Sequence, residues 1–496
     1  MKKFKNTLLI TLSFIAMSCS DEFLDTVPTN SVAESVVFSN IDNAWGAING
    51  IHRELYFSTP GNSQDEGGFS SIMISLDVLG EDLVHPSTST QWFSGDYRWQ
   101  SHTSATNTLP DYNWNQLYII IADANSIIAN IDGVAGPQNE LDNIKGQALA
   151  YRAWAYHNLV QMFGKRYVAG GPNTDLGVPL YTEPALEPKE RATVAAVYAQ
   201  INADLDAAIG LLDGATDRPN KSHLDVSVAR GLKARVALTQ GLWTVAISNA
   251  TAALADYTLM SNADYQSGFN DYTNEEWMWG SHVIEDQQIF FWGFHAFMSH
   301  NFSSSNIRGN PKCMFSPLHD AIPTTDVRSS LFVPSGIPPE MRPTTTSLTF
   351  PYHAIKFKSV GQSPNSNGDH PYMRAAEMYL IKAEAEQRNG SDALAAQTLF
   401  DLNSNRDPSY TLSSNTGQAL LDEIWLYRRA ELWGEGFRFY DLKRNNLPLD
   451  RQQGVGNHNA SATANLWTVP AGDKRWQFLI PQAEIDNNPL IVQNEL

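Results

Sequence analysis

Apolar residues recur at steps of three and four over several long stretches of the chain, which is the period of an amphipathic helix. The pattern is clearest over residues 193–212, with apolar side chains at Val194, Val197, Ile201, Leu205, Ile209 and Leu212. It predicts further helices over residues 140–164, 225–241, 243–257, 374–389, 392–405 and 418–434.

These predicted helices are rich in alanine and follow one another in pairs, with glycine at turns such as Gly241 and Gly390. Small side chains let helices approach closely, and stacked helical hairpins bury a continuous core. We therefore predict a mainly α fold with a tetratricopeptide-like scaffold of helical hairpins, an α/α superhelix with long irregular loops and minor β structure. An irregular helical domain is the alternative.

Two regions interrupt the helical pattern, residues 58–115 and 258–372, both rich in Gly, Pro, Ser, Thr, Asn and aromatic residues. Loops of this length in a compact protein usually carry function. Residues 445–496 are also loop-like. The expected organisation is a leader over residues 1–18, an N-terminal helical part over 19–257 with an aromatic loop near 58–115, an irregular insert over 258–372, and a C-terminal part over 373–496 that completes the scaffold.

The N-terminus has the pattern of an export signal. Lys2, Lys3 and Lys5 precede ten apolar residues at positions 8–17, and this run is too short to span a bilayer. The following Ala16-Met17-Ser18-Cys19 resembles a bacterial lipobox, which implies that the Cys19 sulfur carries diacylglycerol and anchors the protein in a membrane. A secreted protein with an incidental cysteine is the alternative. Cys313 then has no disulfide partner, and we expect it to be a buried thiol.

Composition excludes several classes of function. Of the 496 residues, 42% are hydrophobic and 18% are charged, and the formal charge of −19 becomes −22 without the three leader lysines. This acidity argues against general nucleic-acid binding and against attraction to anionic lipid. The chain lacks the HExxH, CxxC, GxGxxG, P-loop and GxSxG motifs, and His295 and His300 lie five residues apart, on different faces of a helix. We predict no catalytic residues, no metal and no cofactor.

The segment over residues 428–444, RRAELWGEGFRFYDLKR, resembles the signature helix of the SusD/RagB family of Bacteroidetes outer-membrane nutrient-binding lipoproteins. Other blocks agree in order along the chain: the start at Cys19, the helix from Arg152 to Gly164, the segment from Arg191 to Ala208, the helix from Arg374, and the end from Ile480 to Asn494. Because buried charges must be paired, we expect Glu431, Glu435, Arg438, Asp441 and Arg444 to pair across packed segments and not to bind ligand.

The resemblance implies a cell-surface protein that captures an oligosaccharide and delivers it to a SusC-like TonB-dependent outer-membrane transporter, without catalysis. Some members bind peptides, so a peptide ligand is one alternative. A secreted helical polysaccharide-degrading enzyme and a tetratricopeptide-type assembly scaffold are alternatives from other classes.

Aromatic side chains among small polar residues suit glycans, because rings stack on the C–H faces of sugars and polar groups bind the hydroxyls. Two stretches have this character, residues 86–116 and 277–302. In them we predict ligand-binding roles for Trp92, Asp96, Tyr97, Trp99, Trp292 and His295. The alternative is that these aromatic residues fasten the loops to the scaffold. We expect Trp114 in the core, and Trp277 and Trp279 on a core strand.

Residues 301–360 carry a local excess of basic side chains, namely Arg308, Lys312, Arg328, Arg342, Lys356 and Lys358. This excess indicates either a site for an acidic sugar or a transporter contact, or else ordinary surface ion pairs. We favour the ion pairs.

Overall fold

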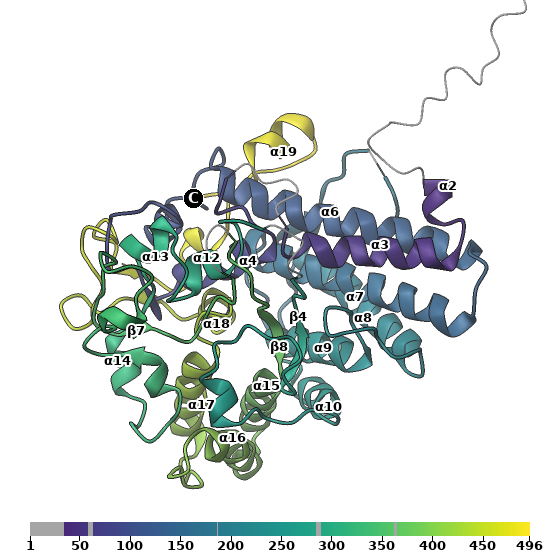
Figure 1. Ribbon diagram of the computed structural model, residues 1–496. Helices are drawn as coiled ribbons and strands as arrows, with labels where there is room; N and C mark the ends of the chain where they lie inside the picture. Colours follow the sequence, from purple (N-terminus) through teal and green to yellow (C-terminus); the bar gives the residue numbers. More distant parts are fainter. Residues whose placement is uncertain (1–33, 58–62, 186, 284–288, 362–364) are drawn as a thin grey trace, which may run out of the picture.

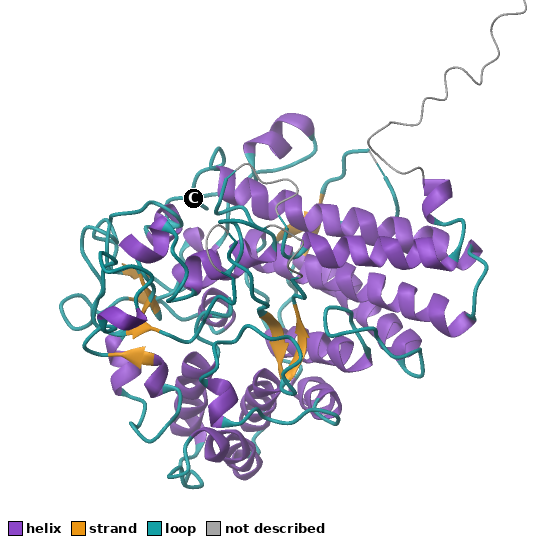
Figure 2. Cartoon of the chain, viewed as in Figure 1, coloured by secondary structure: helices purple, strands orange, loops and turns teal. Residues whose placement is uncertain are grey.

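The long helices form the scaffold of the protein. The computed structural model describes residues 34–57, 63–185, 187–283, 289–361 and 365–496. Long helices fill one side of the molecule, and loops with short strands gather on the other (Figure 2). The scaffold helices are α3 (Ile41–Glu54), α6 (Thr108–Asn130), α7 (Gln138–Phe163), α8 (Val194–Leu212), α9 (Val226–Gln240), α10 (Trp243–Ala253), α15 (Ala375–Arg388), α16 (Asp392–Arg406) and α17 (Gly417–Glu431).

Neighbouring helices pack as hairpins: α7 lies between α6 and α8, α9 packs on α10, and α15 packs on α16 (Figure 1). Contacts between α10 and α15 join the N-terminal hairpins to the C-terminal ones. The predicted mainly α scaffold of hairpins is confirmed.

Local sequence explains where these helices begin and end. Asp225 caps α9, because its side chain accepts a hydrogen bond from the Val228 amide at 2.9 Å. Gly241 ends the same helix with a left-handed φ of 73°. Thr193 caps α8 in the same way as Asp225 caps α9. One predicted boundary is wrong, since the helix expected over 243–257 ends at Ala253.

The region 58–115 is less irregular than its composition indicated. It contains α4 (Phe69–Val78), every residue of which is buried. A helix that is buried on all sides has no polar face, so its sequence lacks the amphipathic period. The short helix α5 (Ser94–Tyr97) and the start of α6 also fall in this region.

The described residues of 258–372 form loops, short helices and short strands. Two of these helices are α12 (His295–Met298) and α13 (Ser305–Gly309). One sheet has the order β1-β5-β7-β6, formed by β1 (Leu83–Val84), β5 (Cys313–Met314), β7 (His353–Ala354) and β6 (Phe332–Val333), all antiparallel. Cys313 is buried in β5, as predicted.

The predicted core strand is β4 (Trp277–Gly280), which pairs antiparallel with β8 (Pro371–Arg374), directly before α15. Trp277 and Trp279 are buried, and so is Trp114 in α6. These three predictions are confirmed. The tail contains the hairpin of β9 (Leu449–Asp450) and β10 (Thr468–Val469), and the helix α19 (Gln482–Asn487), within mostly irregular chain.

The signature segment over residues 428–444 is not one helix, which corrects the prediction. Helix α17 ends at Glu431, and α18 (Arg438–Arg444) begins after a turn. Gly434 and Gly436 adopt φ of +80° and +87° in this turn, a backbone conformation that interrupts a right-handed helix.

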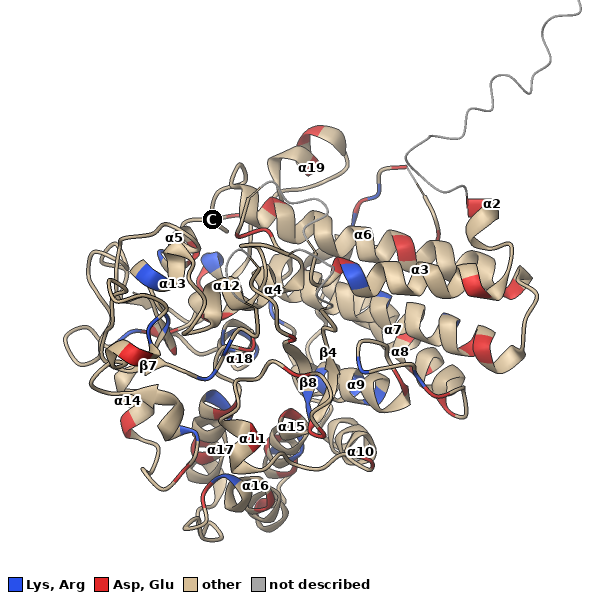
Figure 3. Cartoon of the chain, viewed as in Figure 1, with Lys and Arg blue, Asp and Glu red and all other residues tan. Residues whose placement is uncertain are grey.

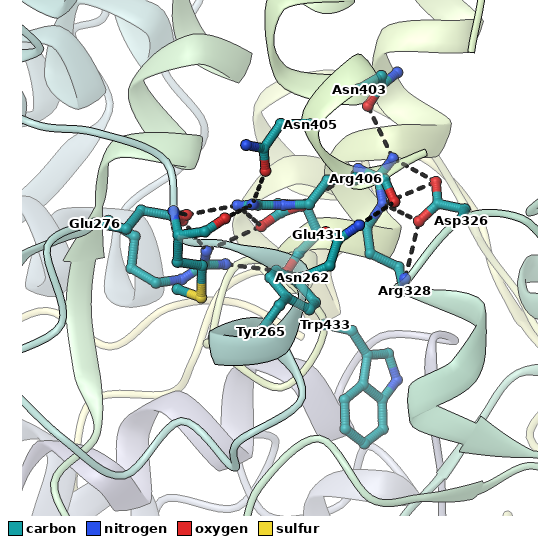
Figure 4. Close-up of polar contacts among 12 residues, drawn as sticks. Asn262, Tyr265, Glu276, Asp326, Arg328, Asn403, Asn405, Arg406, Glu431 and Trp433 are labelled. Atoms are coloured by element: carbon teal, nitrogen blue, oxygen red, sulfur yellow. Dashed lines mark hydrogen bonds and ion pairs between the residues drawn. The ribbon is translucent and has the colours of Figure 1, made fainter. Parts of the chain in front are cut away.

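The charged residues of this segment do pair across packed segments, as predicted. Figure 4 shows Arg406 between Glu276 and Glu431, and Arg328 beside Asp326. Arg374 reaches Glu431 at 2.9 Å and Glu435 at 2.7 Å. Outside this buried network, Arg438 pairs with Glu81, Arg444 with Glu384, and Asp441 with both Arg428 and Arg444.

The basic residues of 301–360 do not form a surface patch. Arg328, Lys312 and Lys356 are buried, and Lys356 pairs with Glu435 at 2.6 Å. Both interpretations from the sequence placed these side chains on the surface, so both are wrong for these three. Basic and acidic positions are interspersed along the described parts of the chain (Figure 3).

Candidate functional site

Most of the aromatic loop that follows β1 is fastened to the scaffold. The Trp99 indole nitrogen donates to the Leu79 carbonyl at 2.8 Å, and its ring packs edge-on against Trp476 with centroids 4.7 Å apart. The Tyr97 hydroxyl contacts His458 Nδ1, and the Arg451 guanidinium lies 4.4 Å from the centre of the Tyr97 ring.

Asp96 is buried beneath the same loop, where its Oδ2 accepts from the Ser75 hydroxyl at 2.6 Å. Burial raises the pKa of Asp96 to about 6, although the hydrogen bonds from Ser75 and Ser101 oppose this. Asp96, Tyr97 and Trp99 therefore expose no surface on which a sugar could bind, and their proposed contact with ligand is corrected to a structural role.

Trp92 differs from these neighbours because it is only partly buried. Its ring packs edge-on against Phe297 of α12, with centroids 6.3 Å apart. The adjacent Phe93 is buried and has a left-handed φ of 56°. Such a conformation is costly for a bulky residue and is found most often at functional sites.

The second predicted stretch also leaves one tryptophan partly exposed. Trp292 lies three residues before α12, and its ring packs edge-on against Phe290. Phe290 is 36% exposed and has a left-handed φ of 44°. The Trp292 backbone lies close against Gly67, where a Cβ atom would come within 2.1 Å of the Trp292 carbonyl oxygen.

His295, by contrast, is buried and does not face a ligand. Its Nε2 is 2.8 Å from the Asp369 carbonyl oxygen. Burial lowers the pKa of His295 to about 4, although the hydrogen bond to Asp369 opposes this. The ring is therefore neutral at physiological pH and attaches α12 to the chain before β8, so the predicted ligand contact is corrected for this residue too.

Trp92 thus packs on α12 through Phe297, and Trp292 lies three residues before the same helix in the chain. Helix α12 lies on the loop-rich side of the molecule (Figure 1). Exposed Thr88 and Gln91 lie beside Trp92. We call Trp92, Trp292, Phe290 and these polar neighbours the aromatic face. Indole rings with hydroxyl and amide groups nearby form a surface that can stack on a sugar and bind its hydroxyls.

Sequence reasoning missed Phe290 as a candidate. Residues 289–292 form an apolar run, IFFW, and a run of this kind indicates core and does not distinguish one ring from the next. The left-handed φ of Phe290 and the partial exposure of its ring are set by the folded loop and have no signal in residue type.

Several hollows lie away from the aromatic face. One of about 480 Å³ is lined by polar residues that include Asp264, Asp271 and Glu275. Another of about 380 Å³ lies between α6, residues 181–185 and α19, with Tyr118 and Tyr181 on its walls. The described residues contain no cluster of three or more His, Cys, Asp or Glu side chains arranged to hold a metal ion.

In the part of the chain that the structure describes, no helix has both the length and the apolar character that crossing a membrane requires. Cys19 lies outside the described residues, so the predicted lipid anchor stays a prediction.

Comparison with known proteins gives a consistent picture. Residues 72–238 match a family described as starch-binding and associating with the outer membrane, and residues 338–496 match the SusD family. The chain is 22% identical to the SusD-like protein P25 of Formosa agariphila, over 99% of this chain and 98% of that protein.

Solved structures agree over almost the whole length. A SusD-like carbohydrate-binding protein of Bacteroides vulgatus is 27% identical, with a TM-score of 0.81 over 92% of this chain and 98% of that one. A SusD superfamily protein of Bacteroides thetaiotaomicron is 26% identical, with a TM-score of 0.79 over 92% of this chain and 100% of that one. A laminarin-binding SusD-like protein shares the fold at 22% identity, with a TM-score of 0.70 over 92% of this chain and 99% of that one.

Proposed function

The chain belongs to the SusD/RagB family, and on that premise we propose that it captures an oligosaccharide on the aromatic face and delivers it to a SusC-like TonB-dependent transporter. Proteins of this family associate with the outer membrane and bind carbohydrate. In the proposal, the lipid on Cys19 anchors the protein at the cell surface, and the protein itself catalyses no reaction.

The observation that carries this proposal is the pair of partly exposed tryptophans, Trp92 packed on α12 and Trp292 three residues before it. In the described structure, the other predicted aromatic side chains of the 86–101 loop are buried. Trp92 and Trp292 each lie near a phenylalanine with a left-handed φ, Phe93 and Phe290 respectively. The loops thus hold these two indoles at the surface although burial would favour their apolar rings.

Isothermal titration against a panel of neutral and acidic oligosaccharides tests the proposal. Laminarin fragments belong in the panel because one protein of the same fold binds laminarin. The protein is used without residues 1–19, which removes the predicted leader and the predicted lipidation site at Cys19. We expect Trp92→Ala and Trp292→Ala each to weaken binding about tenfold, because losing one stacked ring costs about 1.5 kcal/mol.

Trp243→Ala is the matched control. Trp243 is also a partly buried tryptophan, but it begins α10 in the helical scaffold, where Arg388 covers its ring. Its removal is expected to leave affinity unchanged. If neither Trp92→Ala nor Trp292→Ala weakens binding, the sugar binds somewhere other than the aromatic face. Binding of peptides but no sugar would favour the peptide alternative, and cleavage of any polysaccharide in the panel would contradict a purely binding role.

A further inference from the structure

Lys312 is a buried amine without an acidic partner among the residues that the structure describes. Only 2% of the residue is exposed, and among the described residues no carboxylate oxygen lies within 4.0 Å of its Nζ atom. Nζ donates instead to the Asn310 carbonyl at 3.2 Å and to Asn306 Oδ1 at 3.4 Å. A buried ammonium group is costly unless it is paired, so this arrangement requires an explanation.

The two asparagines beside Lys312 also hold the loop that carries Trp92. The Thr90 hydroxyl donates to Asn306 Oδ1 at 3.3 Å, and the Ser87 amide donates to Asn310 Oδ1 at 3.1 Å. The other end of the Asn306 amide donates to the Phe297 carbonyl at 3.3 Å, and Phe297 is the ring on which Trp92 packs.

We propose that Lys312 is a positioning residue for the aromatic face: its ammonium group orients the Asn306 amide, which in turn holds Thr90 and the Trp92 loop in the geometry that binds sugar. This inference rests on the proposed function. Lys312 itself is covered and does not touch the ligand.

The elements packed around Lys312 contribute few other charges. Cys313 follows it on β5, His85 lies just after β1, and His353 lies on β7. Arg308 on α13 is exposed and bonds the Ser304 carbonyl. More distant Arg451, Arg98 and His458 act on His85.

Of these nearby groups, Lys312 is the one that changes charge near neutral pH. Burial lowers its pKa to about 7, although the interaction with Cys313 opposes this. Burial also lowers the pKa of His353 to about 3, lowers the pKa of His85 well below its ordinary value, and raises the pKa of the Cys313 thiol.

The direction of the pH effect follows from the hydrogen bond to Asn306. A charged donor makes a bond about twice as strong as a neutral one, so deprotonation of Lys312 loosens Asn306 and the Thr90 contact. Affinity for sugar is therefore expected to fall as pH rises through about 7. Between pH 6 and pH 8.5 we expect the dissociation constant to increase about fivefold, which corresponds to part of one charged hydrogen bond.

Titration calorimetry of the chain without residues 1–19, at pH 6 and pH 8.5 with laminarin fragments or whichever oligosaccharide of the panel binds most tightly, tests the inference. Thr90→Val removes the link from Asn306 to the loop and is expected to abolish most of the pH dependence. Lys312→Met is also expected to abolish most of the pH dependence. If Lys312→Met does not fold, Thr90→Val alone still tests the inference, because Thr90 is partly exposed and its replacement disturbs the fold less.

Ser89→Ala is the matched control. The Ser89 hydroxyl donates to the Gly309 carbonyl, so it ties the same loop to α13 without passing through Asn306. This variant should keep the pH dependence of the wild type. Burial also raises the pKa of Asp369 to about 7. Both Thr90→Val and Ser89→Ala keep Asp369, so a difference in pH dependence between these two variants comes from the contacts of Lys312 and Asn306 and not from Asp369.

Three outcomes would overturn the inference: pH-independent binding by the wild type, full pH dependence in Thr90→Val, or loss of the pH dependence in Ser89→Ala. A wild type that binds no sugar at either pH would instead contradict the proposed function on which the inference rests.

Discussion

Asp96 is a carboxyl group that the fold places in its interior under the Trp92 loop. Its pKa of about 6 lies above the ordinary value near 4 because burial disfavours the charged form. Between these two values the folded state holds more protons than the unfolded state. Stability therefore falls as pH rises from about 4 to about 6.

Asp96→Asn keeps an acceptor for the Ser75 hydroxyl and removes the titration. We expect its free energy of unfolding at pH 7 to be at least that of the wild type, and higher by up to about 1–2 kcal/mol. Between pH 4 and pH 6, the free energy of unfolding should fall less in the variant than in the wild type. Urea denaturation followed by tryptophan fluorescence at several pH values measures this. A variant much less stable than the wild type at pH 7 would mean that the Asp96 charge is favourable. Asp132→Asn, at an exposed carboxylate, is the control.

At the same scale, the sequence located the candidate stretches better than it located the side chains that stay exposed in them. Trp92 and Trp99 both stand among small polar residues in one loop. Only the fold separates them, because Leu79 and Trp476 supply a hydrogen bond and a ring that cover Trp99. Leu79 lies 20 residues away and Trp476 lies 377 residues away, so no local pattern contains this information.

At the scale of the elements, the local pattern failed to predict the turn that separates α17 from α18. The turn arises from the backbone conformation of its glycines. At Gly436 a Cβ atom would lie 2.8 Å from Met73 Cα, and φ is +87°. The turn therefore needs glycine both for its conformation and for the close approach of α4. Regular amphipathic helices, by contrast, were predicted to within a few residues because their period and caps are local.

We expect Gly436→Ala to lower the free energy of unfolding by about 2–5 kcal/mol, the sum of left-handed strain and overpacking. Gly390→Ala separates the two causes, since Gly390 has a similar φ of +81° with no atom within 4 Å of the added Cβ. It should cost only about 1–2 kcal/mol. Equal losses in urea denaturation would contradict the role given to the contact with Met73.

At the scale of the whole molecule, the buried network joins parts of the chain that are far apart in sequence. Glu431 on α17 contacts Arg328 of the insert, Arg374 on β8 and Arg406 at the end of α16. Burial alone would raise the pKa of Glu431, but the charges of Arg406, Arg374 and Arg328 lower it below its ordinary value. Its contribution to stability is thus present above pH 4.5 and is lost as pH falls below it.

Glu431→Gln leaves these three buried guanidinium groups with less compensating charge. We expect a loss of about 3–5 kcal/mol at pH 7, and a smaller difference from the wild type below pH 4. Thermal and urea denaturation measure both. Lys165→Gln, which breaks the exposed pair with Asp175, should change stability by less than about 1 kcal/mol. A loss no larger than that of Lys165→Gln would mean that the network contributes little to holding these segments together.

The burial of Cys313 in β5 has a practical consequence for spectroscopy. The sequence contains one other cysteine, Cys19, and burial raises the pKa of the Cys313 thiol, so this group reacts slowly with maleimides. A chain without residues 1–19 therefore has almost no background labelling. A single cysteine introduced as Gln91→Cys, at an exposed position next to Trp92, would accept a spin label or dye and report the motion of this loop without the replacement of any native thiol.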